Sequence, residues 1–522
     1  LPTIYESRDY TNENDLNLLA TYDKSYRKHH VTAIGGYQLL TSDFNNLYGY
    51  RQGNNFPQYM EINAFDPTGQ STTGYTNQFA LMSYFGRLNY NFDSKYFLEA
   101  NVRNDGSSRF AEGYKWGVFP SFSAAWRFSS EKFMKNLNWL SNGKFRASWG
   151  QMGNQSVGSN YPFALSIATN MYTVFGGVLN PGYAALNYAI NNITWESTTM
   201  FDLGTDISFF YNKLNVSLDW YNKQTNNILL SMAIPGVMGY ANSPKQNAGA
   251  VENKGWDLTV SYNNSIGKFN YKITGIASDV QNQMTDLGGL GPQVSGAHVK
   301  QVGSPIDAFY GLQANGLFNS FTEARAYPIA QFGKLQGGDI RYNDLDGDSK
   351  ITGNDRFVMG NPIPRYTFSL DLSGSYKGFD FAAFFQGVGK RDDYISGWLA
   401  YPFQNASTAF VQHLDRWYEG NPNPNATYPR LSINQQSNNL QSSTFWMLNG
   451  AYVRLKNIQI GYTIPNSAIK KIGVSSLRVY ANGNNLFTIT KMPLGMDPES
   501  PESNNNYAPL IKMYTFGVQV KF

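Results

Sequence analysis

The residues whose types and spacing could do chemistry lie in one short acidic segment. Asp344, Asp346 and Asp348 occur at alternate positions, and Asp355 follows seven residues later. In a twelve-residue loop these are positions 1, 3, 5 and 12, with the backbone carbonyl of Lys350 at position 7, which is the ligand spacing of an EF-hand-type calcium loop. Oxygen-only ligands select a hard cation, and Ca²⁺ accepts irregular geometry better than Mg²⁺. The segment therefore predicts a structural Ca²⁺ site.

Two positions of this loop depart from the EF-hand pattern. Ser349 stands where the turn glycine is usual, and Asp355 replaces the longer bidentate glutamate. The alternative interpretation is a solvated acidic loop whose carboxylates accept hydrogen bonds from nearby backbone N–H groups. Both interpretations remain open from the sequence.

A second polar cluster resembles the ingredients of a hydrolase. Its members are Arg103, Asp105, Ser107, Ser108 and Arg109. The four histidines, none at a triad-like or metal-ligand spacing, are His29, His30, His298 and His413. Structural hydrogen bonds between a loop and a strand are therefore the better interpretation. We predict no catalytic residues and no enzyme activity.

Other side chains are candidates for binding rather than catalysis. Arg454 and Lys456 share one face of a predicted strand, where pairing with loop or plug carboxylates is favoured over a substrate clamp. Aromatic residues in predicted loops could stack on sugar rings, or pack within their own loops. They are Tyr172, Phe309, Tyr310, Trp398, Tyr401 and Phe403. No single one is assigned to substrate.

The composition favours a membrane barrel. Aromatic residues make up 16% of the 522 residues, while charged residues make up only 15%. A large soluble protein usually has about a quarter charged residues. There is no cysteine, so disulfides and thiolate metal sites are excluded, and the net charge of +4 indicates no nucleic-acid partner.

Alternating hydrophobicity predicts the strands. Leu214, Val216, Leu218 and Trp220 alternate with polar residues, so one face of this strand suits lipid and the other suits water. About fifteen such stretches occur, several near the ~10 residues that cross a bilayer at a tilt. The last one ends at Phe522. The predicted fold is all-β: a transmembrane antiparallel β-barrel.

Short and long connections alternate along the chain, as in outer-membrane barrels with periplasmic turns and extracellular loops. Residues 1–15 are predicted to begin in an extracellular loop, and 42–77 to be a long one. Residues 279–364 are predicted to form one long extracellular excursion that contains the acidic loop 344–355. Short helices are expected at 131–140, 407–418 and 466–472.

An odd number of strands cannot close a barrel whose two ends lie in the periplasm. About seven further strands are therefore expected upstream, in a barrel of roughly 22 strands. We also expect that this chain does not form a closed barrel alone, because unpaired strand edges are costly in hydrocarbon.

Six segments in order resemble the SusC/RagA-like TonB-linked outer-membrane proteins of Bacteroidetes. They are 84–90 (YFGRLNY), 103–110 (RNDGSSRF), 116–121 (WGVFPS), 149–155 (WGQMGNQ), 452–457 (YVRLKN) and 495–499 (GMDPE). The resemblance implies the C-terminal part of a barrel filled by an N-terminal plug, which with the first strands is absent from this chain. It also implies TonB contact through that N-terminal part, a SusD-like surface lipoprotein, and a membrane with lipopolysaccharide.

The function implied by the resemblance is active import of oligosaccharides or peptides across the outer membrane. Two alternatives stay open: a passive, porin-like channel, and a surface binding or assembly scaffold. The sequence does not identify the substrate or the residues that bind it.

Overall fold

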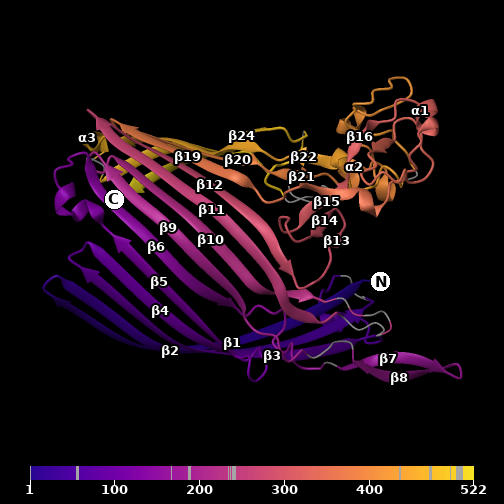
Figure 1. Ribbon diagram of the computed structural model, residues 1–522, viewed down its shortest axis with the longest axis horizontal. Helices are drawn as coiled ribbons and strands as arrows, with labels where there is room; N and C mark the ends of the chain where they lie inside the picture. Colours follow the sequence, from indigo (N-terminus) through magenta and orange to yellow (C-terminus); the bar gives the residue numbers. More distant parts are fainter. Residues whose placement is uncertain are drawn as a thin grey trace. The chain divides into compact units, whose positions relative to one another are not determined.

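One large antiparallel sheet dominates the computed structural model (Figure 1). The structure describes residues 2–53, 58–165, 167–185, 190–232, 234, 237, 243–433, 437–469, 473–493, 495–500 and 510–522. The sheet has fifteen strands that follow one another in chain order. They are β1 (Thr3–Tyr26), β2 (His29–Gln52), β3 (Ser71–Phe92), β4 (Tyr96–Ser107), β5 (Trp116–Trp126), β6 (Leu140–Asn154), β9 (Glu196–Phe209), β10 (Leu214–Ser231), β11 (Lys245–Ile266), β12 (Phe269–Leu287), β19 (Arg365–Tyr376), β20 (Phe379–Lys390), β23 (Tyr452–Ile464), β24 (Ser476–Thr490) and β25 (Met513–Lys521). The predicted fold class and approximate strand number are confirmed.

Tight turns join the strands at one end of the sheet. Arg27 and Lys28 alone connect β1 to β2, and Arg27 has a φ of 52°. The connection from β3 to β4 has Asp93 and Ser94 in the same left-handed region, at φ 55° and 52°. Side chains of Lys28 and Lys95 pair with Asp93 there. These short connections agree with the predicted alternation of short and long loops.

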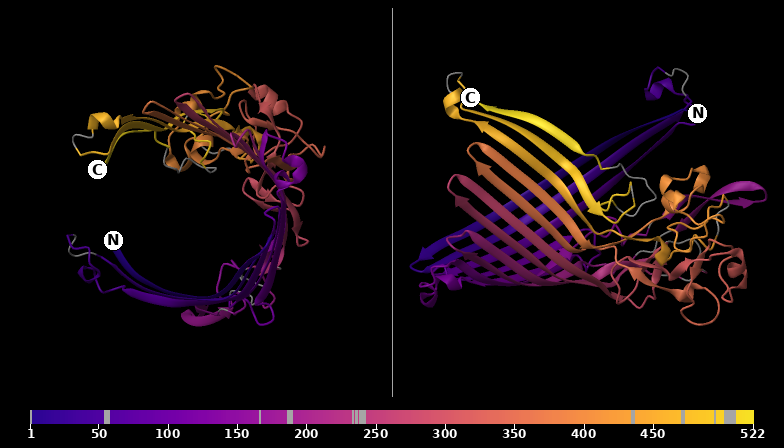
Figure 2. Two further views of the ribbon diagram at one scale, coloured as in Figure 1. Left: turned by 90° about the vertical axis from the view of Figure 1, so that its left-hand side faces the viewer. Right: turned by 90° about the horizontal axis from the view of Figure 1, so that it is seen from above.

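The chain divides into two compact units, which are described separately. The first contains residues 1–127, 146–202 and 223–250, and the second contains 128–145, 203–222 and 251–522. The first unit holds the two longest strands, β1 and β2 with 24 residues each, next to β3 with 22 (indigo in Figure 2).

The long strands correct two predictions. Residues 3–15 belong to β1 and are paired with β2, so they are not a loop. Half of the predicted loop 42–77 consists of the end of β2 and the beginning of β3. In these parts both faces are rich in polar residues, so the period of two that marks a half-apolar strand is absent from the sequence. Backbone pairing nevertheless continues.

The second unit contains a module built from two long connections, residues 288–364 and 391–450, which we call the loop module. Figure 1 shows it beyond one end of β12, β19 and β20. Short strands and helical turns form it. They are the four-stranded sheet of β13 (Gln293–Ser295), β14 (His298–Lys300), β15 (Ala308–Leu312) and β18 (Arg356–Gly360), the pairs β16 (Ala314–Leu317) with β17 (Ile340–Tyr342) and β21 (Asp392–Tyr394) with β22 (Met447–Asn449), and helices α1 (Phe321–Ala326) and α2 (Gly397–Ala400).

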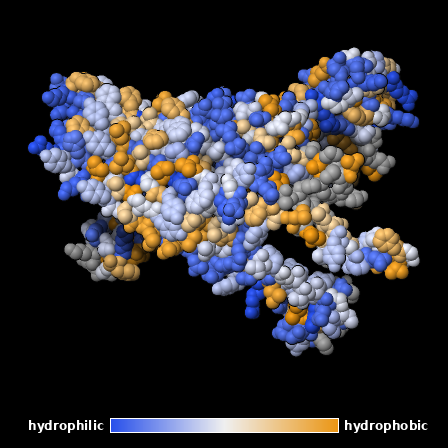
Figure 3. All heavy atoms as spheres, turned by 60° about the horizontal axis from the view of Figure 1, so that its bottom comes forward, coloured by the Kyte–Doolittle hydropathy of each residue, from blue (hydrophilic) through white to orange (hydrophobic). Residues whose placement is uncertain are grey.

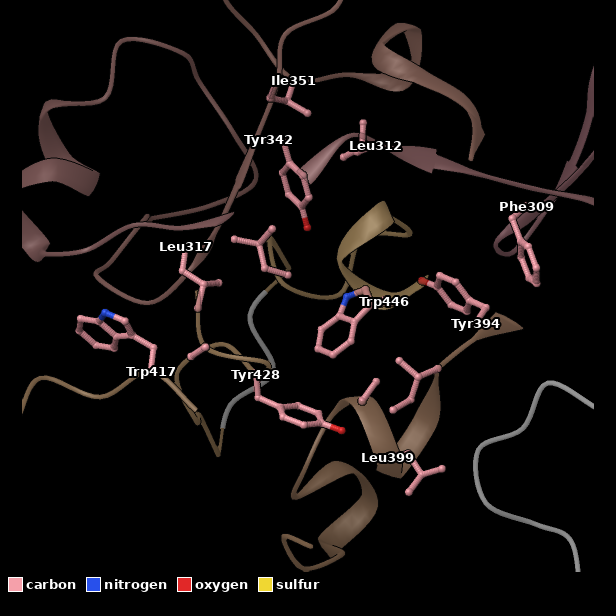
Figure 4. Packing of buried hydrophobic residues seen from close by; sticks show 14 residues of the cluster. Phe309, Leu312, Leu317, Tyr342, Ile351, Tyr394, Leu399, Trp417, Tyr428 and Trp446 are labelled. Atoms are coloured by element: carbon pink, nitrogen blue, oxygen red, sulfur yellow. The ribbon is translucent and has the colours of Figure 1, made fainter. Parts of the chain in front are cut away.

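A hydrophobic core holds the loop module together. Trp446 is 1% exposed and lies among Tyr342, Tyr394, Leu399 and Tyr428 (Figure 4). Both connections contribute to this core, since its members come from 309–351 and from 394–446. Hydrogen bonds also join the connections: Tyr342 donates to the Asn438 carbonyl (2.7 Å), and Ile340 N–H donates to the Asn439 side chain (2.9 Å).

The predicted helices are shorter than expected. In 131–140 the structure has a 3₁₀ turn at Lys132–Met134, and in 407–418 another at Val411–Leu414. Helix α3 covers Asn466–Ile469, and residues 470–472 lie outside the described residues. Within the part of the chain that the structure describes, no helix has the length and hydrophobicity needed to cross a membrane.

Candidate functional site

The two faces of the sheet in the first unit differ in chemistry. Leu88, Leu98 and Phe122 are each about half exposed on one face, where they line a shallow apolar hollow on neighbouring strands. Figure 3 shows apolar residues at the surface, interspersed with polar ones. Exposure of such an apolar face to water costs free energy, whereas its contact with lipid is favourable.

The opposite face of the same strands carries hydrogen-bonded polar side chains among apolar ones such as Ile34, Phe85 and Phe119. Gln38, Asn101, Arg103 and Ser121 help to line a hollow of about 840 Å³ there. Exposed apolar side chains on one face and hydrogen-bonded polar side chains on the other are the arrangement of a barrel wall between lipid and an aqueous lumen.

The second unit repeats this alternation on β10. Leu218 and Trp220 are 42% and 44% exposed. Directly before Leu218, Ser217 donates a 2.8 Å hydrogen bond to Asp206 of β9 on the other face. The predicted lipid-facing positions therefore keep one face of the strand in this structure.

Arg103 is the centre of a hydrogen-bond network on the polar face. It donates to Asp105, Gln38 and Ser83, each at 2.7 Å. These partners come from β2, β3 and β4, so the guanidinium cross-links three neighbouring strands. The network is structural, as predicted for this cluster.

Ser107, Ser108 and Arg109 connect the end of β4 to surrounding segments. Ser107 donates to Gln155 (2.7 Å), and the Ser108 hydroxyl accepts from the Ala80 N–H (2.8 Å). Arg109 donates to Asn160 (2.7 Å) and lies 4.2 Å above the Phe79 ring centre. The serines are thus occupied in joining loops to strands.

A serine–histidine contact was missed from the sequence because its residues come from two strands. Ser25 Oγ lies 2.8 Å from His30 Nδ1, and His30 Nε2 lies 3.5 Å from an Asp23 oxygen. The His30 and Asp23 side chains are 42% and 57% exposed beside the β1–β2 turn. Because these side chains are exposed to solvent, we interpret the contact as a structural one that joins the adjacent ends of β1 and β2.

The acidic loop brings three of its predicted ligands together. One carboxylate oxygen each from Asp344, Asp346 and Asp348 lies within 4.8 Å of the other two. Asp344 accepts from the N–H groups of Gly347 and Ser349, both at 2.7 Å. Gly347 has a φ of 78° and Ser349 a φ of 67°, so the serine at the usual glycine position adopts the left-handed conformation that the turn requires.

Lys350 enters the loop through its backbone. Its N–H donates to Asp348 at 2.8 Å. On either side, Ala330 N–H donates to the Ser349 carbonyl (3.0 Å) and Ile351 N–H donates to the Ala330 carbonyl (2.8 Å), which ties the loop to the rest of the module.

The fourth predicted carboxylate, Asp355, is not part of this cluster. It is fully buried, and its oxygens accept from the N–H groups of Leu345 and Thr352, both at 2.7 Å. Burial would raise the pKa of Asp355, but the backbone N–H groups that it accepts from together lower it. In this structure Asp355 stabilises the fold of the loop. The carboxylates of Asp344, Asp346 and Asp348, together with backbone carbonyl oxygens, are left as ligands of a type that suits a hard cation.

Arg454 and Lys456 bind loop carboxylates, as one of the predicted alternatives stated. Arg454 is 2% exposed and contacts Asp497 and Glu499, both at 2.8 Å. Lys456 pairs with Glu499 at 2.5 Å. Arg391 adds a 2.7 Å hydrogen bond to the Pro498 carbonyl. Three cations thus hold residues 495–500 against the wall of the second unit.

The aromatic residues considered for sugar stacking have different positions. Phe309 is fully buried and Tyr401 packs edge-to-face on Trp446, so both serve the module core. Tyr310, Trp398 and Phe403 are partly buried. Tyr172 is 59% exposed on the hairpin of β7 (Ile167–Phe175) and β8 (Val178–Ala185).

Comparison with known proteins assigns this wall to a class. The family described as "TonB dependent receptor-like, beta-barrel" matches residues 2–388, about three quarters of the chain. The chain therefore belongs to the TonB-dependent receptor-like β-barrel family, whose members are outer-membrane receptors and transporters and not enzymes.

Individual relatives agree with this assignment. The chain is 30% identical to TonB-dependent receptor P3 of Formosa agariphila, over 99% of this chain and 53% of the relative. It is 26% identical to TonB-dependent receptor SusC of Bacteroides thetaiotaomicron, over 91% of this chain and 47% of the relative. The chain spans about half the length of the curated relatives that it matches.

Solved structures show the same fold. The RagAB peptide transporter superimposes with a TM-score of 0.85 at 23% identity, over 100% of this chain and 56% of the other. The predicted resemblance to SusC/RagA-like transporters is confirmed.

Proposed function

We propose that the whole protein to which this chain contributes imports oligosaccharides or peptides across the outer membrane by a TonB-dependent mechanism. The observation that carries the proposal is the sheet with an apolar and a polar face, within a chain of the TonB-dependent receptor family. A relative is named SusC and a structure of the same fold is titled a peptide transporter, which supports the transport class.

Energy dependence distinguishes this proposal from a passive channel. The test is uptake of radiolabelled oligosaccharide and peptide mixtures by cells that express the full-length protein, with and without functional TonB. We expect uptake only with TonB, whereas equal uptake in both strains would favour a porin. Surface binding without uptake in either strain would favour the scaffold alternative.

We further propose that residues 279–364 lie on the extracellular side and that a SusD-like lipoprotein covers this side of the barrel. The loop module supports this because it has its own core and stands at the end of β12, β19 and β20 away from their short turns. Purification in mild detergent at native expression should retain the lipoprotein. A barrel that purifies alone from cells containing the lipoprotein would contradict the partnership.

We also propose that the acidic loop binds one Ca²⁺ through Asp344, Asp346, Asp348 and the Lys350 carbonyl, with Asp355 supporting the loop fold. The three clustered carboxylates and the left-handed turn at Ser349 support the fit. The ion would supply no chemistry and would stiffen the module, adding about 2.7 kcal/mol at a hundredfold excess over its Kd.

The calcium test uses hydrogen exchange of residues 340–356 in the full-length protein, with Ca²⁺ or with chelator. We expect Ca²⁺ to slow exchange in the wild type and in Asp307→Asn, whose side chain is an exposed carboxylate elsewhere in the module. Asp346→Asn and Asp348→Asn should lose the response. Equal exchange in Ca²⁺ and chelator would reject the site.

A further inference from the structure

We call three segments the strand tops: residues 3–15 of β1, 41–52 of β2 and 71–81 of β3. They are the parts of the long strands farthest from the short turns, and they extend beyond the apolar band, the part of the sheet whose outer face is apolar. The register places Leu16 opposite Leu39, and Leu39 opposite Met82, on the apolar face. On that same face the next positions are mainly amides, hydroxyls and a carboxylate. They are Asn12, Asn14, Asp43, Asn45, Thr76 and Gln78.

Strand length agrees with this boundary. A 24-residue strand at ~3.3 Å per residue extends about 80 Å, whereas a tilted strand needs only ~10 residues to cross the bilayer. The strand tops therefore lie in water, on the side away from the tight β1–β2 turn.

The other face of the strand tops, which continues the polar face of the wall, carries a ladder of aromatic rings. Tyr5 and Tyr75 are 69% and 60% exposed. Tyr5 stacks on Tyr48 at a centroid distance of 6.1 Å, and Tyr75 contacts Phe44 at 5.5 Å. Tyr50 lies directly opposite Tyr5 in the register. Five rings from three strands thus share one solvated surface.

Polar groups lie between these rings. Asn46 donates to Asp9 at 2.6 Å, which holds an amide beside a carboxylate in the row between Tyr48 and Phe44. Tyr75 lies opposite Asn46 on the next strand, and Asn77 accepts from Asn160 at 2.7 Å in the following row. Flat rings alternating with fixed amide and carboxylate groups match the two surfaces of a sugar, an apolar C–H face and an edge of hydroxyls.

A peptide gains less on this surface. Peptides bound to sheets take much of their affinity from backbone hydrogen bonds at an edge. The rings lie on the face of the sheet, which presents side chains only, because the backbone N–H and C=O groups of paired strands lie in the plane of the sheet. Asp9, Glu13 and Asp15 of β1 point to the same face, so a sulfated or uronic glycan would meet like charge.

We propose that the ladder of Tyr5, Tyr48, Tyr75 and Phe44, with Asp9 and Asn46, binds a neutral oligosaccharide outside the membrane. This inference rests on the proposed import function. It names the substrate class that the strand tops would bind before import.

The test is isothermal titration of the full-length protein in detergent with neutral oligosaccharides of six sugars, covering α- and β-linked glucans, xylans and mannans. A sulfated hexasaccharide and a mixture of hexapeptides serve as competing probes. The triple variant Tyr5→Ala, Tyr48→Ala, Tyr75→Ala is compared with Tyr10→Ala. Tyr10 lies on the same strand and is 62% exposed, but it points to the opposite face.

We expect a neutral probe to bind wild type and Tyr10→Ala equally, and the triple variant at least tenfold more weakly. Asp9→Ala should weaken binding severalfold, whereas Arg8→Ala, one residue away and on the other face, should not. Unchanged electrophoretic heat-modifiability of each variant shows that the barrel is intact.

Several results would overturn the inference. These are the absence of binding by every neutral probe, equal affinity in the triple variant, or ring-dependent binding of the peptides in place of the glycans. The TonB-dependent uptake assay is independent of this titration: uptake that persists while the ladder binds nothing leaves the proposed import function standing. Glycan binding that depends on the rings, without TonB-dependent uptake, would contradict the proposed import function and leave the ladder standing as a binding site.

Discussion

The strand tops of β1–β3 and the loop module show two ways to build beyond a membrane-spanning sheet. The strand tops extend the sheet itself: Tyr5 and Tyr75 stay well exposed, and backbone pairing holds the segment. The loop module leaves the sheet and forms its own core, in which Trp446 and Tyr342 are almost completely buried.

The difference teaches where side chains are free to act. In the module, the large aromatic residues stabilise the fold, so few of them can contact a ligand. In the strand tops the backbone ladder provides the stability, so the side chains of one face are available for binding. Candidate ligand residues are therefore better sought on extended strands than in loops with a core.

The largest effect should follow from removing the centre of the module core. Trp446→Ala should destabilise the module by about 3–5 kcal/mol, because it creates a cavity among Tyr342, Tyr394 and Tyr428. Limited proteolysis should then cut the module while β1–β3 stay protected. Trp220→Ala on β10 is the control, since Trp220 is already 44% exposed. Cleavage that spreads equally into β1–β3 would contradict two independent modes of stabilisation.

A buried ion pair should have the next largest effect. Asp339 is 1% exposed and pairs with Arg430 at 2.7 Å, joining the two connections of the module. Arg430→Met leaves a buried carboxylate and should cost about 3–5 kcal/mol in the free energy of unfolding.

The matched controls for this pair are a second variant and a second ion pair. Adding Asp339→Asn to Arg430→Met should recover part of the loss. Breaking the more exposed pair of Arg341 with Glu323 by Arg341→Met should cost at most about 1 kcal/mol. Similar losses for Arg430→Met and Arg341→Met, measured by denaturant unfolding, would show that burial of the pair is unimportant.

A smaller effect should locate the boundary between the strand tops and the lipid. Leu18→Arg should cost about 2–4 kcal/mol if Leu18 lies at mid-bilayer, and Leu218→Arg in the second unit should do the same. Tyr10→Arg, on the same face of β1 as Leu18, should be nearly neutral because it lies above the apolar band. Equal losses in the free energy of barrel unfolding for Leu18→Arg and Tyr10→Arg would contradict a lipid boundary between these two positions.

The smallest effect concerns acidification of the module. His413 is 1% exposed; its Nδ1 accepts from Phe410 N–H and its Nε2–H donates to the Leu399 carbonyl, both at 2.9 Å. Burial lowers the pKa of His413 below its usual value near 6.5. Below that value the unfolded chain binds a proton that the folded module resists, so stability is present above about pH 6.5 and declines as the pH falls toward the lowered folded pKa.

Hydrogen exchange of residues 397–414 measured from pH 7.5 to pH 5 tests this dependence after correction for intrinsic exchange. Protection should fall severalfold in the wild type. His413→Phe should be less protected at pH 7.5 but should show a flatter pH profile. The same slope in wild type and variant would assign the pH dependence to other groups.

The alternation of apolar and polar residues predicts strands at 365–376, 379–389 and 476–488, and β19, β20 and β24 match these bounds to within two residues. The sequence also predicted the contact of Arg454 and Lys456 with loop carboxylates, since both cations lie on one face of a strand. Of the acidic loop, Asp344, Asp346 and Asp348 come together as predicted, whereas Asp355 does not.

The periodicity of the sequence by itself determined the class of fold. Alternation of apolar and polar residues with a period of two indicates a sheet with lipid on one face and water on the other, and it is recognised without knowing which strands pair. Only the tertiary structure decided how far β1–β3 extend, because strand parts in which both faces mix polar and aromatic residues have no such period and are recognised by their pairing. Only the tertiary structure decided that two distant connections share the core around Trp446, because contacts between residues over 100 positions apart depend on chain topology. The burial of Asp355 depends in the same way on the backbone N–H groups that surround it in the folded loop.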